Sequence, residues 1–417
     1  YPGANASFIF TELLKDKYLT FGKLRASWSI VGKDAPANVL TTVNVPFNVS
    51  DGFQNTNVRS PFIGYNGTTQ VPGYTQSNSA GNENLRPEMI NSWEIGTELG
   101  FFNDRLYLDM ALYGSSTTDG IFQVNVAPST GYTTRYINAG KMTNTGYEIM
   151  MRAIPIAKPN FKLEATVNFT QNVNRVTEVY PGVKQFALGG ISGASPYVDS
   201  GSAYGTFYVN SYDRSPDGRI VVDATSGLPV SSGKLMMSGS YLPNYTMGFG
   251  LSATLFKRFK AAITFDYKNG GVFYSRTKDI VEFLGSGVTT IVNDRKDYVI
   301  PNTVNLVNGA YLDNTTAVFV QDWMTQGQAE DYMLDASFMK LRELSFSYSF
   351  PVKAAWNKYV KSIDVGLFGN NLVLWVPASN KFVDPEINSF GTGNVQGIDF
   401  SNIPSVRSIG ANLKLTF

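Results

Sequence analysis

Paired acids and glycine-rich segments are the features of this 417-residue chain whose residue types could support chemistry. Acids stand close together in Asp294-Arg295-Lys296-Asp297 and in Asp384-Pro385-Glu386. Neither segment has the spacing of oxygen ligands that a calcium loop needs, so we interpret them as solvated loop charge and a structural turn. The glycines of Asn269-Gly270-Gly271 and Leu188-Gly189-Gly190 precede no helical pattern, which predicts turns rather than phosphate-binding loops.

The chain contains no histidine and no cysteine. Histidine is the usual general base and the commonest metal ligand, and cysteine supplies thiolate nucleophiles and disulfides. Hydrolytic chemistry that depends on histidine therefore cannot reside in this chain alone. We expect no enzyme activity, no catalytic residue, no bound metal and no cofactor. The balance of 34 basic and 33 acidic residues also argues against a nucleic-acid partner.

Apolar and polar residues alternate in segment after segment, and this pattern must define the elements that carry any site. Across residues 409–417 the odd positions are apolar and the even positions are small, polar or charged. Alternation with a period of two predicts a half-buried strand. About eleven such strands are predicted, near residues 6–12, 23–30, 93–101, 105–112, 147–154, 161–170, 247–255, 259–268, 343–350, 362–367 and 409–417.

The connections between these strands alternate between short and long. Short turns are expected at residues 103–104, 157–160, 257–258 and 351–361, and long polar loops at 32–90, 117–139, 176–240, 269–332 and 373–403. The strands are ~10 residues long or longer, whereas strands of soluble sheets are typically ~5–6 residues long. Their apolar face is rich in aromatic residues near the strand ends, where interface girdles lie. These features favour an all-β fold, a transmembrane antiparallel β-barrel with an apolar outer face and a polar lumen, over a soluble sandwich.

The direction of the strands predicts that this barrel is incomplete. The final strand must run toward the side of the short turns, and counting back through eleven strands gives the first strand the same direction. A single-chain bacterial barrel has an even number of strands. Residues 1–5 show no signal-peptide pattern. We therefore expect residues 1–417 to be the C-terminal half of a larger, even-numbered barrel.

Several segments resemble the motifs of one family, in the order in which that family carries them. They are Asn84-Leu85-Arg86-Pro87-Glu88 with Ser92-Trp93-Glu94-Ile95-Gly96, Ile137-Asn138-Ala139-Gly140 with Asn144-Thr145-Gly146-Tyr147-Glu148, residues 242–246, residues 338–344 with Phe350-Pro351, Asn370-Asn371-Leu372, Asp384-Pro385-Glu386, and residues 404–408 leading to 415–417. This ordered set is similar to SusC/RagA-type TonB-linked (TonB-dependent) outer-membrane transporters of Bacteroidetes type.

The resemblance implies a 22-stranded barrel in the bacterial outer membrane, of which residues 1–417 would supply strands 12 to 22, with the plug domain and the first half of the barrel absent. The partners it implies are a SusD-like surface lipoprotein that lids the barrel, the TonB complex acting through the missing N-terminal part, the rest of the barrel and plug, and outer-membrane lipid. The expected function is active import of an oligomeric nutrient, either a glycan or an oligopeptide. A passive outer-membrane porin and a TonB-dependent siderophore or cobalamin receptor remain alternatives.

Charged residues on the predicted lumen face form one candidate set. We expect them mainly to pair with one another or to contact the plug, and less often to contact substrate. The set is Lys23, Arg25, Glu94, Glu98, Arg105, Asp109, Glu148, Arg152, Lys162, Glu164, Lys260, Asp266, Lys268 and Glu343.

Aromatic residues in the long loops are the expected substrate contacts, because flat rings stack on sugar faces and on peptide side chains alike. The alternative is that these rings pack the loops on one another or on the lipoprotein lid. They are Tyr197, Tyr204, Phe207, Tyr208, Tyr212 and Trp323. At the end of the last alternating strand, Phe417 resembles the terminal aromatic of outer-membrane barrels, which implies a membrane-assembly signal.

Overall fold

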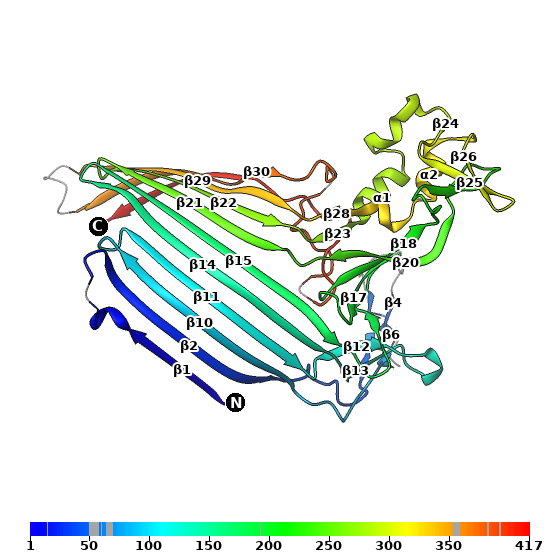
Figure 1. Cartoon of the computed structure of the whole chain (residues 1–417), viewed down its shortest axis with the longest axis horizontal. Helices are drawn as coiled ribbons and strands as arrows, with labels where there is room; N and C mark the ends of the chain where they lie inside the picture. The colour runs from blue at the N-terminus through cyan, green and yellow to red at the C-terminus, as the bar shows by residue number, and fades with distance from the viewer. Residues whose placement is uncertain are drawn as a thin grey trace.

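A single antiparallel sheet of eleven long strands dominates the computed structural model, which describes residues 1–14, 16–49, 58–59, 61–63, 70–191, 193–352, 359–381, 383–391 and 393–417 (Figure 1). We call this sheet the wall. Its strands, in their order across the sheet, are β1 (Gly3–Ile9), β2 (Leu19–Lys33), β10 (Glu88–Phe101), β11 (Leu106–Thr118), β14 (Lys141–Lys158), β15 (Phe161–Glu178), β21 (Tyr245–Leu255), β22 (Phe259–Asn269), β29 (Phe338–Phe350), β30 (Ser362–Trp375) and β32 (Ser408–Thr416). Each overlaps a predicted segment, so the predicted number and order of strands are confirmed.

The register of the wall places apolar and polar side chains on opposite faces. Leu251 of β21 pairs with Ala165 on one side and Ile263 on the other, whereas its neighbour Ser252 pairs with Glu164. Residues that face each other across an antiparallel pair lie on the same face of a sheet. The predicted separation of the two faces is therefore present along the strands.

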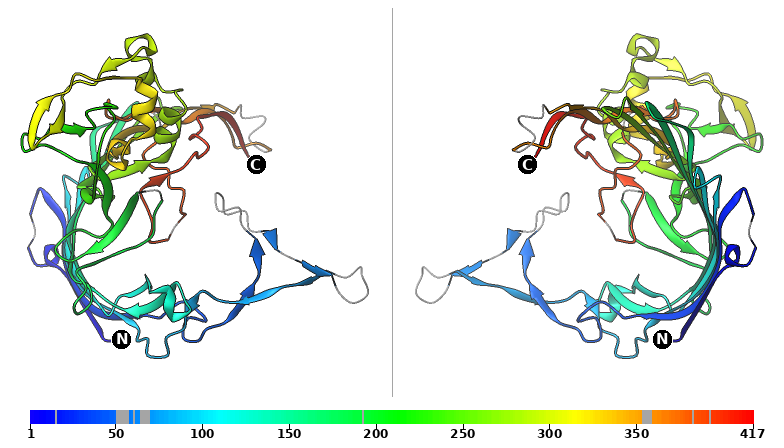
Figure 2. Two further views of the ribbon diagram at one scale, coloured as in Figure 1. Left: turned by 90° about the vertical axis from the view of Figure 1, so that its right-hand side faces the viewer. Right: turned by 90° about the vertical axis from the view of Figure 1, so that its left-hand side faces the viewer.

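The wall is curved and open. Figure 2 shows it as an arc whose two ends, β1 and β32, stand apart. Within the described residues, β1 pairs only with β2, and β32 pairs only with β30. Because all neighbouring strands are antiparallel and their number is eleven, the two edge strands run in the same direction, as expected from the sequence.

Short and long connections lie at opposite ends of the wall (Figure 1). Residues 10–18, which include the 3-10 turn η1 (Phe10–Glu12), and residues 102–105, 159–160 and 256–258 form short connections. The predicted turn at 351–361 belongs to this end as well, although its residues 353–358 lie outside the described part of the chain. The five long loops, residues 34–87, 119–140, 179–244, 270–337 and 376–407, all leave the other end, which confirms the predicted alternation.

The long loops carry many short elements. The first contains β3 (Asn44–Pro46), β4 (Asn48–Val49), β5 (Val58–Arg59), β6 (Pro61–Ile63), β7 (Gln70–Pro72), β8 (Tyr74–Gln76) and β9 (Ser79–Ala80), and the second contains β12 (Ile121–Asn125), η2 (Pro128–Thr130) and β13 (Thr134–Asn138). The third contains β16 (Gln185–Ala187), β17 (Ala194–Asp199), β18 (Thr206–Tyr212), β19 (Ile220–Val222) and β20 (Ser231–Ser240). The fourth contains β23 (Val272–Ser275), α1 (Arg276–Phe283), η3 (Val288–Arg295), β24 (Tyr298–Val299), β25 (Thr303–Val307), β26 (Ala310–Asp313), β27 (Ala317–Val318), α2 (Val320–Thr325), η4 (Ala329–Tyr332) and β28 (Met333–Asp335), and the fifth contains β31 (Ile398–Asp399).

The third, fourth and fifth long loops pack together into what we call the loop module. Its main core joins Phe207 of the third loop, Tyr274 of the fourth and Ile398 of the fifth, all almost completely buried. A second cluster around Phe122 and Val198 ties the second loop to the third. Among the described residues, no helix is both long enough and apolar enough to cross a membrane. The buried core therefore lies at the long-loop end of the molecule.

Candidate functional site: the junction of the wall and the last loop

An irregularity in β29 brings two basic residues to the concave face of the wall. Asp266 of β22 pairs with Lys340, and Thr264 pairs with Glu343, so Arg342 is an extra residue between two regular pairs. On the other side, the register between β29 and β30 also shifts between Leu341 and Glu343. A β-bulge of this kind redirects side chains locally. Here it lets both Lys340 and Arg342 reach residues of the fifth long loop.

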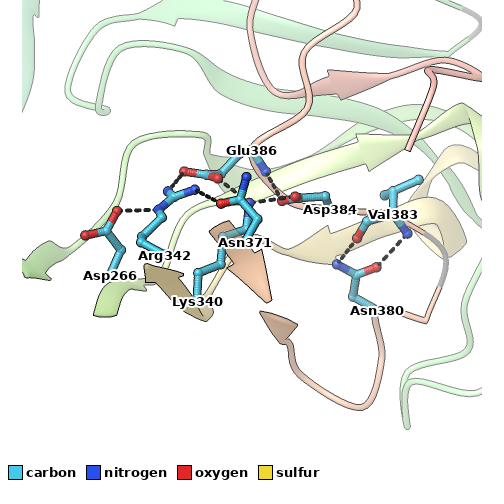
Figure 3. A network of polar contacts seen from close by, with 8 residues as sticks. All are labelled: Asp266, Lys340, Arg342, Asn371, Asn380, Val383, Asp384 and Glu386. Carbon is cyan, nitrogen blue, oxygen red and sulfur yellow. Dashed lines mark hydrogen bonds and ion pairs between the residues drawn. The ribbon is translucent and has the colours of Figure 1, made fainter. Parts of the chain in front are cut away.

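These two bases bind three carboxylates in a continuous network, which Figure 3 shows from close by. The Lys340 ammonium lies 2.6 Å from Asp384 Oδ2 and also donates to Glu386. The Arg342 guanidinium donates from Nε to Asp266 Oδ2 at 2.6 Å and from Nη2 to Glu386. Glu386 therefore accepts from both bases and links the loop to two positions of the wall.

Burial makes this network costly to break. The side chains of Lys340 and Asp384 are only 5% and 4% exposed. Burial is the largest single effect on the pKa of Asp384 and raises it, but the hydrogen bonds from Lys340, the Glu386 N–H and Ser405, together with the charge of Lys340, outweigh burial and hold the pKa below its usual value. Burial also raises the pKa of Glu386, and the hydrogen bonds and charges of Arg342 and Lys340 together outweigh it, so this pKa lies below its usual value too. Both carboxylates are thus held in the charged form that the bases require.

The loop is shaped to present its two acids together. The Asp384 carboxylate accepts a hydrogen bond from the backbone N–H of Glu386 at 3.1 Å, a local turn that aspartate favours. Before it, the buried Asn380 donates to the carbonyl of Val383 at 2.9 Å and accepts from the Val383 N–H at 3.3 Å. Asp384-Pro385-Glu386 is therefore a structural turn, as interpreted from the sequence, and this turn also carries the ion network.

The fifth loop has a second attachment, to the fourth long loop within the loop module. Its strand β31 runs parallel to β23, and the Tyr274 N–H donates to the carbonyl of Gly397 at 2.9 Å. The hydroxyl of Ser275, which caps helix α1, donates to the buried Asp399 carboxylate at 2.9 Å. Figure 2 shows this loop, coloured red-brown, on the concave side of the wall. One loop therefore connects the wall to the loop module from inside the arc.

A cavity of about 540 Å³ lies where the wall, the fifth loop and the loop module meet. Its polar lining includes Asp266, Lys268, Arg342, Glu386 and Asn388, and its aromatic lining residues on the concave side are Tyr241, Phe273 and Phe338. A volume of this size is typical of a small-molecule site, and rings beside a few polar groups suit binding rather than bond breaking. Among the described residues, no group of three or more acids, histidines or cysteines could hold a metal ion.

The predicted lumen charges are largely paired with one another. Lys23 binds Glu98 at 2.9 Å, Arg25 binds Asp109 at 2.7 Å, and Arg152 binds Glu164 at 2.7 Å. Glu94 and Lys162 join these groups, and Asp266 pairs with Arg342. Mutual pairing on the concave face is thus confirmed for these residues, across strands in each case except Lys162, whose partner Glu164 lies on the same strand β15. Within the described part of the chain, no ion pair is formed by Arg105, Glu148, Lys260, Lys268 or Glu343.

The six loop aromatics fall into two groups by burial. Phe207, Tyr212 and Trp323 are almost fully buried in the cores of the loop module, where the rings of Tyr212 and Trp323 lie 6.1 Å apart. Tyr197, Tyr204 and Tyr208 are partly exposed. Substrate contact by all six stays a prediction, and the partly exposed three have ring surface available for it.

The exposed tyrosines are held in place by their neighbours. The rings of Tyr197 and Tyr208 lie 4.9 Å apart, and the Tyr208 hydroxyl donates to Asp199 Oδ2 at 2.8 Å. Burial and this hydrogen bond raise the pKa of Tyr208 to about 12. Burial also raises the pKa of Tyr204 above its usual range. The rings of Tyr204 and Tyr208 therefore remain neutral at any physiological pH.

The remaining candidate residues from the sequence are exposed. Asp294, Arg295, Lys296 and Asp297 are all exposed, which agrees with solvated loop charge. Phe417 follows β32 and is 72% exposed; a role in membrane assembly stays a prediction.

Sequence reasoning missed Lys340, Arg342 and Asn388 as members of the site. Simple alternation counted back from Glu343 assigns Lys340 and Arg342 to the outer face, and the bulge reverses that assignment. The available signal for the bulge was the presence of Lys340 and Arg342 shortly before Glu343, at positions where alternation expects apolar side chains. No signal in the sequence points to Asn388, because its position depends on the path of the whole loop.

Comparisons with known proteins agree with this architecture. The family described as TonB dependent receptor-like, beta-barrel matches residues 21–372. The chain is 24% identical over 379 residues to TonB-dependent receptor P3 of Formosa agariphila, an alignment that covers 84% of the chain and 36% of that protein. It is 24% identical over 443 residues to TonB-dependent receptor SusC of Bacteroides thetaiotaomicron, covering 97% of the chain and 38% of that protein.

The chain thus spans well under half the length of these two relatives. Among solved structures, it superposes on the RagAB peptide importer in its closed-closed state with a TM-score of 0.72 and 19% identity. That superposition covers 100% of this chain and 43% of the other. At this level of identity the likeness shows the fold.

Proposed function

The chain belongs to the TonB-dependent receptor-like β-barrel family of the outer membrane, and from this premise we propose that it forms the C-terminal half of a TonB-energised importer. The observation that carries the proposal is the open, eleven-stranded antiparallel wall, most of which lies within the family match at residues 21–372. The wall has an apolar outer face for lipid and a polar concave face for a water-filled lumen.

The open edges support a larger barrel. Within the described residues, the outer sides of β1 and β32 have no strand beside them. Each unpaired backbone group in hydrocarbon costs several kcal/mol, which is why membrane-spanning sheets are closed. We propose that further strands, with a plug domain, complete a barrel of 22 strands. That size corresponds to two halves of eleven.

The proposed cargo is an oligomeric nutrient, a glycan or an oligopeptide. Support comes from the relative named SusC and from the neighbour described as a peptide importer. The buried cores of the loop module also support it, because they hold the tyrosines and the cavity of the junction in fixed positions at the long-loop end of the wall. A rigid platform with rings and polar groups suits many weak contacts to a long molecule better than one contact to an ion.

The proposed partner of the loop module is a SusD-like surface lipoprotein. Apolar side chains on and after helix α1 are exposed, including Phe283, Leu284, Val288 and Ile291, each at least half accessible. Figure 1 shows this part of the fourth loop at the margin of the molecule, away from the wall. Exposed apolar side chains that gather on a short stretch of surface typically mark a protein contact.

Deletion of the gene and complementation with the full-length protein test this function. Growth on an oligosaccharide or an oligopeptide should fail in the deletion strain, recover on complementation, and fail again when TonB or the lipoprotein is removed. Normal growth on all such oligomers, with loss of iron or cobalamin uptake instead, would assign the protein to siderophore or cobalamin transport. Uptake that persists without TonB would indicate a passive porin.

A further inference from the structure

The ammonium of Lys268, which lines the cavity at the junction, has no hydrogen-bond or ion-pair partner among the described residues. We propose that this cavity is a subsite that binds a carboxylate-bearing unit of an oligomer, with Lys268 contacting the carboxylate. The proposal rests on the import function and adds the chemical class of the cargo.

Lys268 is placed to meet an anion. It lies at the long-loop end of β22, on the same face as Asp266, and its side chain is half-buried. Asp266 is occupied by Arg342, whereas Lys268 makes no ion pair or hydrogen bond with any described residue. An ammonium removed from water without a partner is unfavourable. A carboxylate in the cavity would supply the missing acceptor.

Asn388 also borders the cavity. Its side-chain nitrogen donates to the carbonyl of Gly391, and its side-chain oxygen is buried. Lys268 is therefore the group that selects the ligand. The carboxylate of a sugar acid or of an acidic amino acid would supply its missing acceptor.

The shape and the remaining lining fit one or two units of an oligomer. The cavity of about 540 Å³ falls within the usual range for small ligands. Tyr241 and Phe338 supply apolar surface beside Lys268. The cavity therefore offers an anion partner and apolar surface together.

The charges nearby set the selectivity. Three carboxylates, Asp266, Asp384 and Glu386, face the two bases Lys340 and Arg342, so this network holds one excess negative charge. Lys268 is the additional base, and its nearest acidic neighbours in electrostatic terms are Glu386 and Asp335. Without Lys268, a carboxylate entering the cavity would meet only net negative charge. Preference for an acidic ligand should therefore depend on this one residue.

The test measures binding of matched probes to the assembled full-length transporter with its lipoprotein. One arm compares an oligogalacturonate with its neutral methyl ester, and the other compares a Glu-containing oligopeptide with its Gln-containing, C-terminally amidated counterpart. The acidic member of one pair should bind more tightly than its neutral form. Lys268→Gln should weaken binding of that acidic probe about ten-fold or more and change the neutral probe less than two-fold, whereas Lys268→Arg should restore the preference. The arm that shows the effect identifies the source of the carboxylate.

A control and a second variant keep the result interpretable. Lys260→Gln removes the same charge from the same face of β22, outside the cavity, and should leave all four probes unaffected. Should Lys268→Gln fail to assemble, Asn388→Asp should weaken the acidic probe alone by repulsion. Equal effects on acidic and neutral probes, no acidic preference, or binding of none of the four probes would overturn the subsite. Growth on oligomers that still requires TonB would leave the import function standing in each case.

Discussion

The wall and the loop module are built on opposite principles. In the wall, large apolar side chains such as Leu367 and Leu413 are 60% and 64% exposed on the outer face, and polar pairs occupy the inner face. In the loop module, Phe207 and Ile398 are completely buried, and aromatic rings pack on one another. The same chain therefore follows two rules for where apolar groups lie.

The difference shows which surroundings each region expects. A strand with lipid on one side and water on the other needs a strict period of two, and its backbone ladder supplies most of its order. The loop module stands beyond that environment and must bury its own apolar surface, as a water-soluble domain does. The junction around Lys340 is where the two regions meet, since its ions connect a strand of the wall to a loop of the module.

Breaking the junction should have the largest effect. Lys340→Met leaves Asp384 buried without its cation, and loss of one member of a buried ion pair typically costs about 3–5 kcal/mol. We expect the fifth loop to become sensitive to protease while the strands of the wall stay intact, as measured by limited proteolysis and heat modifiability. The control is Lys141→Met, whose pair with Glu178 is about half exposed and screened by solvent, so the expected effect on stability is small. Equal effects of the two changes would show that the junction does not hold the regions together.

A charge placed on the outer face of the wall should have the next largest effect. Leu251 and Ser252 are neighbours on opposite faces of β21. Leu251→Arg should cost roughly 2–4 kcal/mol or prevent assembly, because it puts a charge against lipid, whereas Ser252→Arg enters the lumen and should be milder. Unfolding in lipid bilayers measures both. If the two variants were equally harmful, the assignment of faces would be wrong.

Removal of a single hydroxyl should have the smallest effect, and its cost should differ between the loop module and the wall. In the loop module, the buried Tyr212 hydroxyl donates to Asp331 and accepts from the Gln328 N–H at 3.2 Å. Tyr212→Phe leaves this N–H unsatisfied and should cost about 1–2 kcal/mol. Tyr348→Phe, on the outer face of the wall, removes a hydroxyl that bonds no described residue and should stay within about 0.5 kcal/mol. Hydrogen exchange of each region reports the difference, and a reversed order would contradict the comparison.

The same contrast explains how much the sequence could predict. All eleven strands of the wall followed from alternation, because a period of two is a local signal that neighbouring residues carry together. The loop module gave no such signal. Phe207 is buried by Ile398, almost two hundred residues away, so its place inside a core could not be told from that of the partly exposed Tyr208. At Arg342, alternation with a period of two predicts the wrong face, because the bulge inserts one residue and moves the residues before it to the other face.

The connections between strands of the wall differ greatly in length, and the entropy of loop closure therefore favours some strand pairs over others. Three residues, 256–258, separate β21 from β22, whereas 68 residues, 270–337, separate β22 from β29. For a flexible chain each doubling of a loop costs about 0.6 kcal/mol, so the longer closure is disfavoured by roughly 3 kcal/mol. Pairs joined by short connections, such as β10 with β11 and β14 with β15, are thus the natural units of assembly. The wall is in this sense a row of hairpins, and the long loops can fold their own cores while the hairpins find one another.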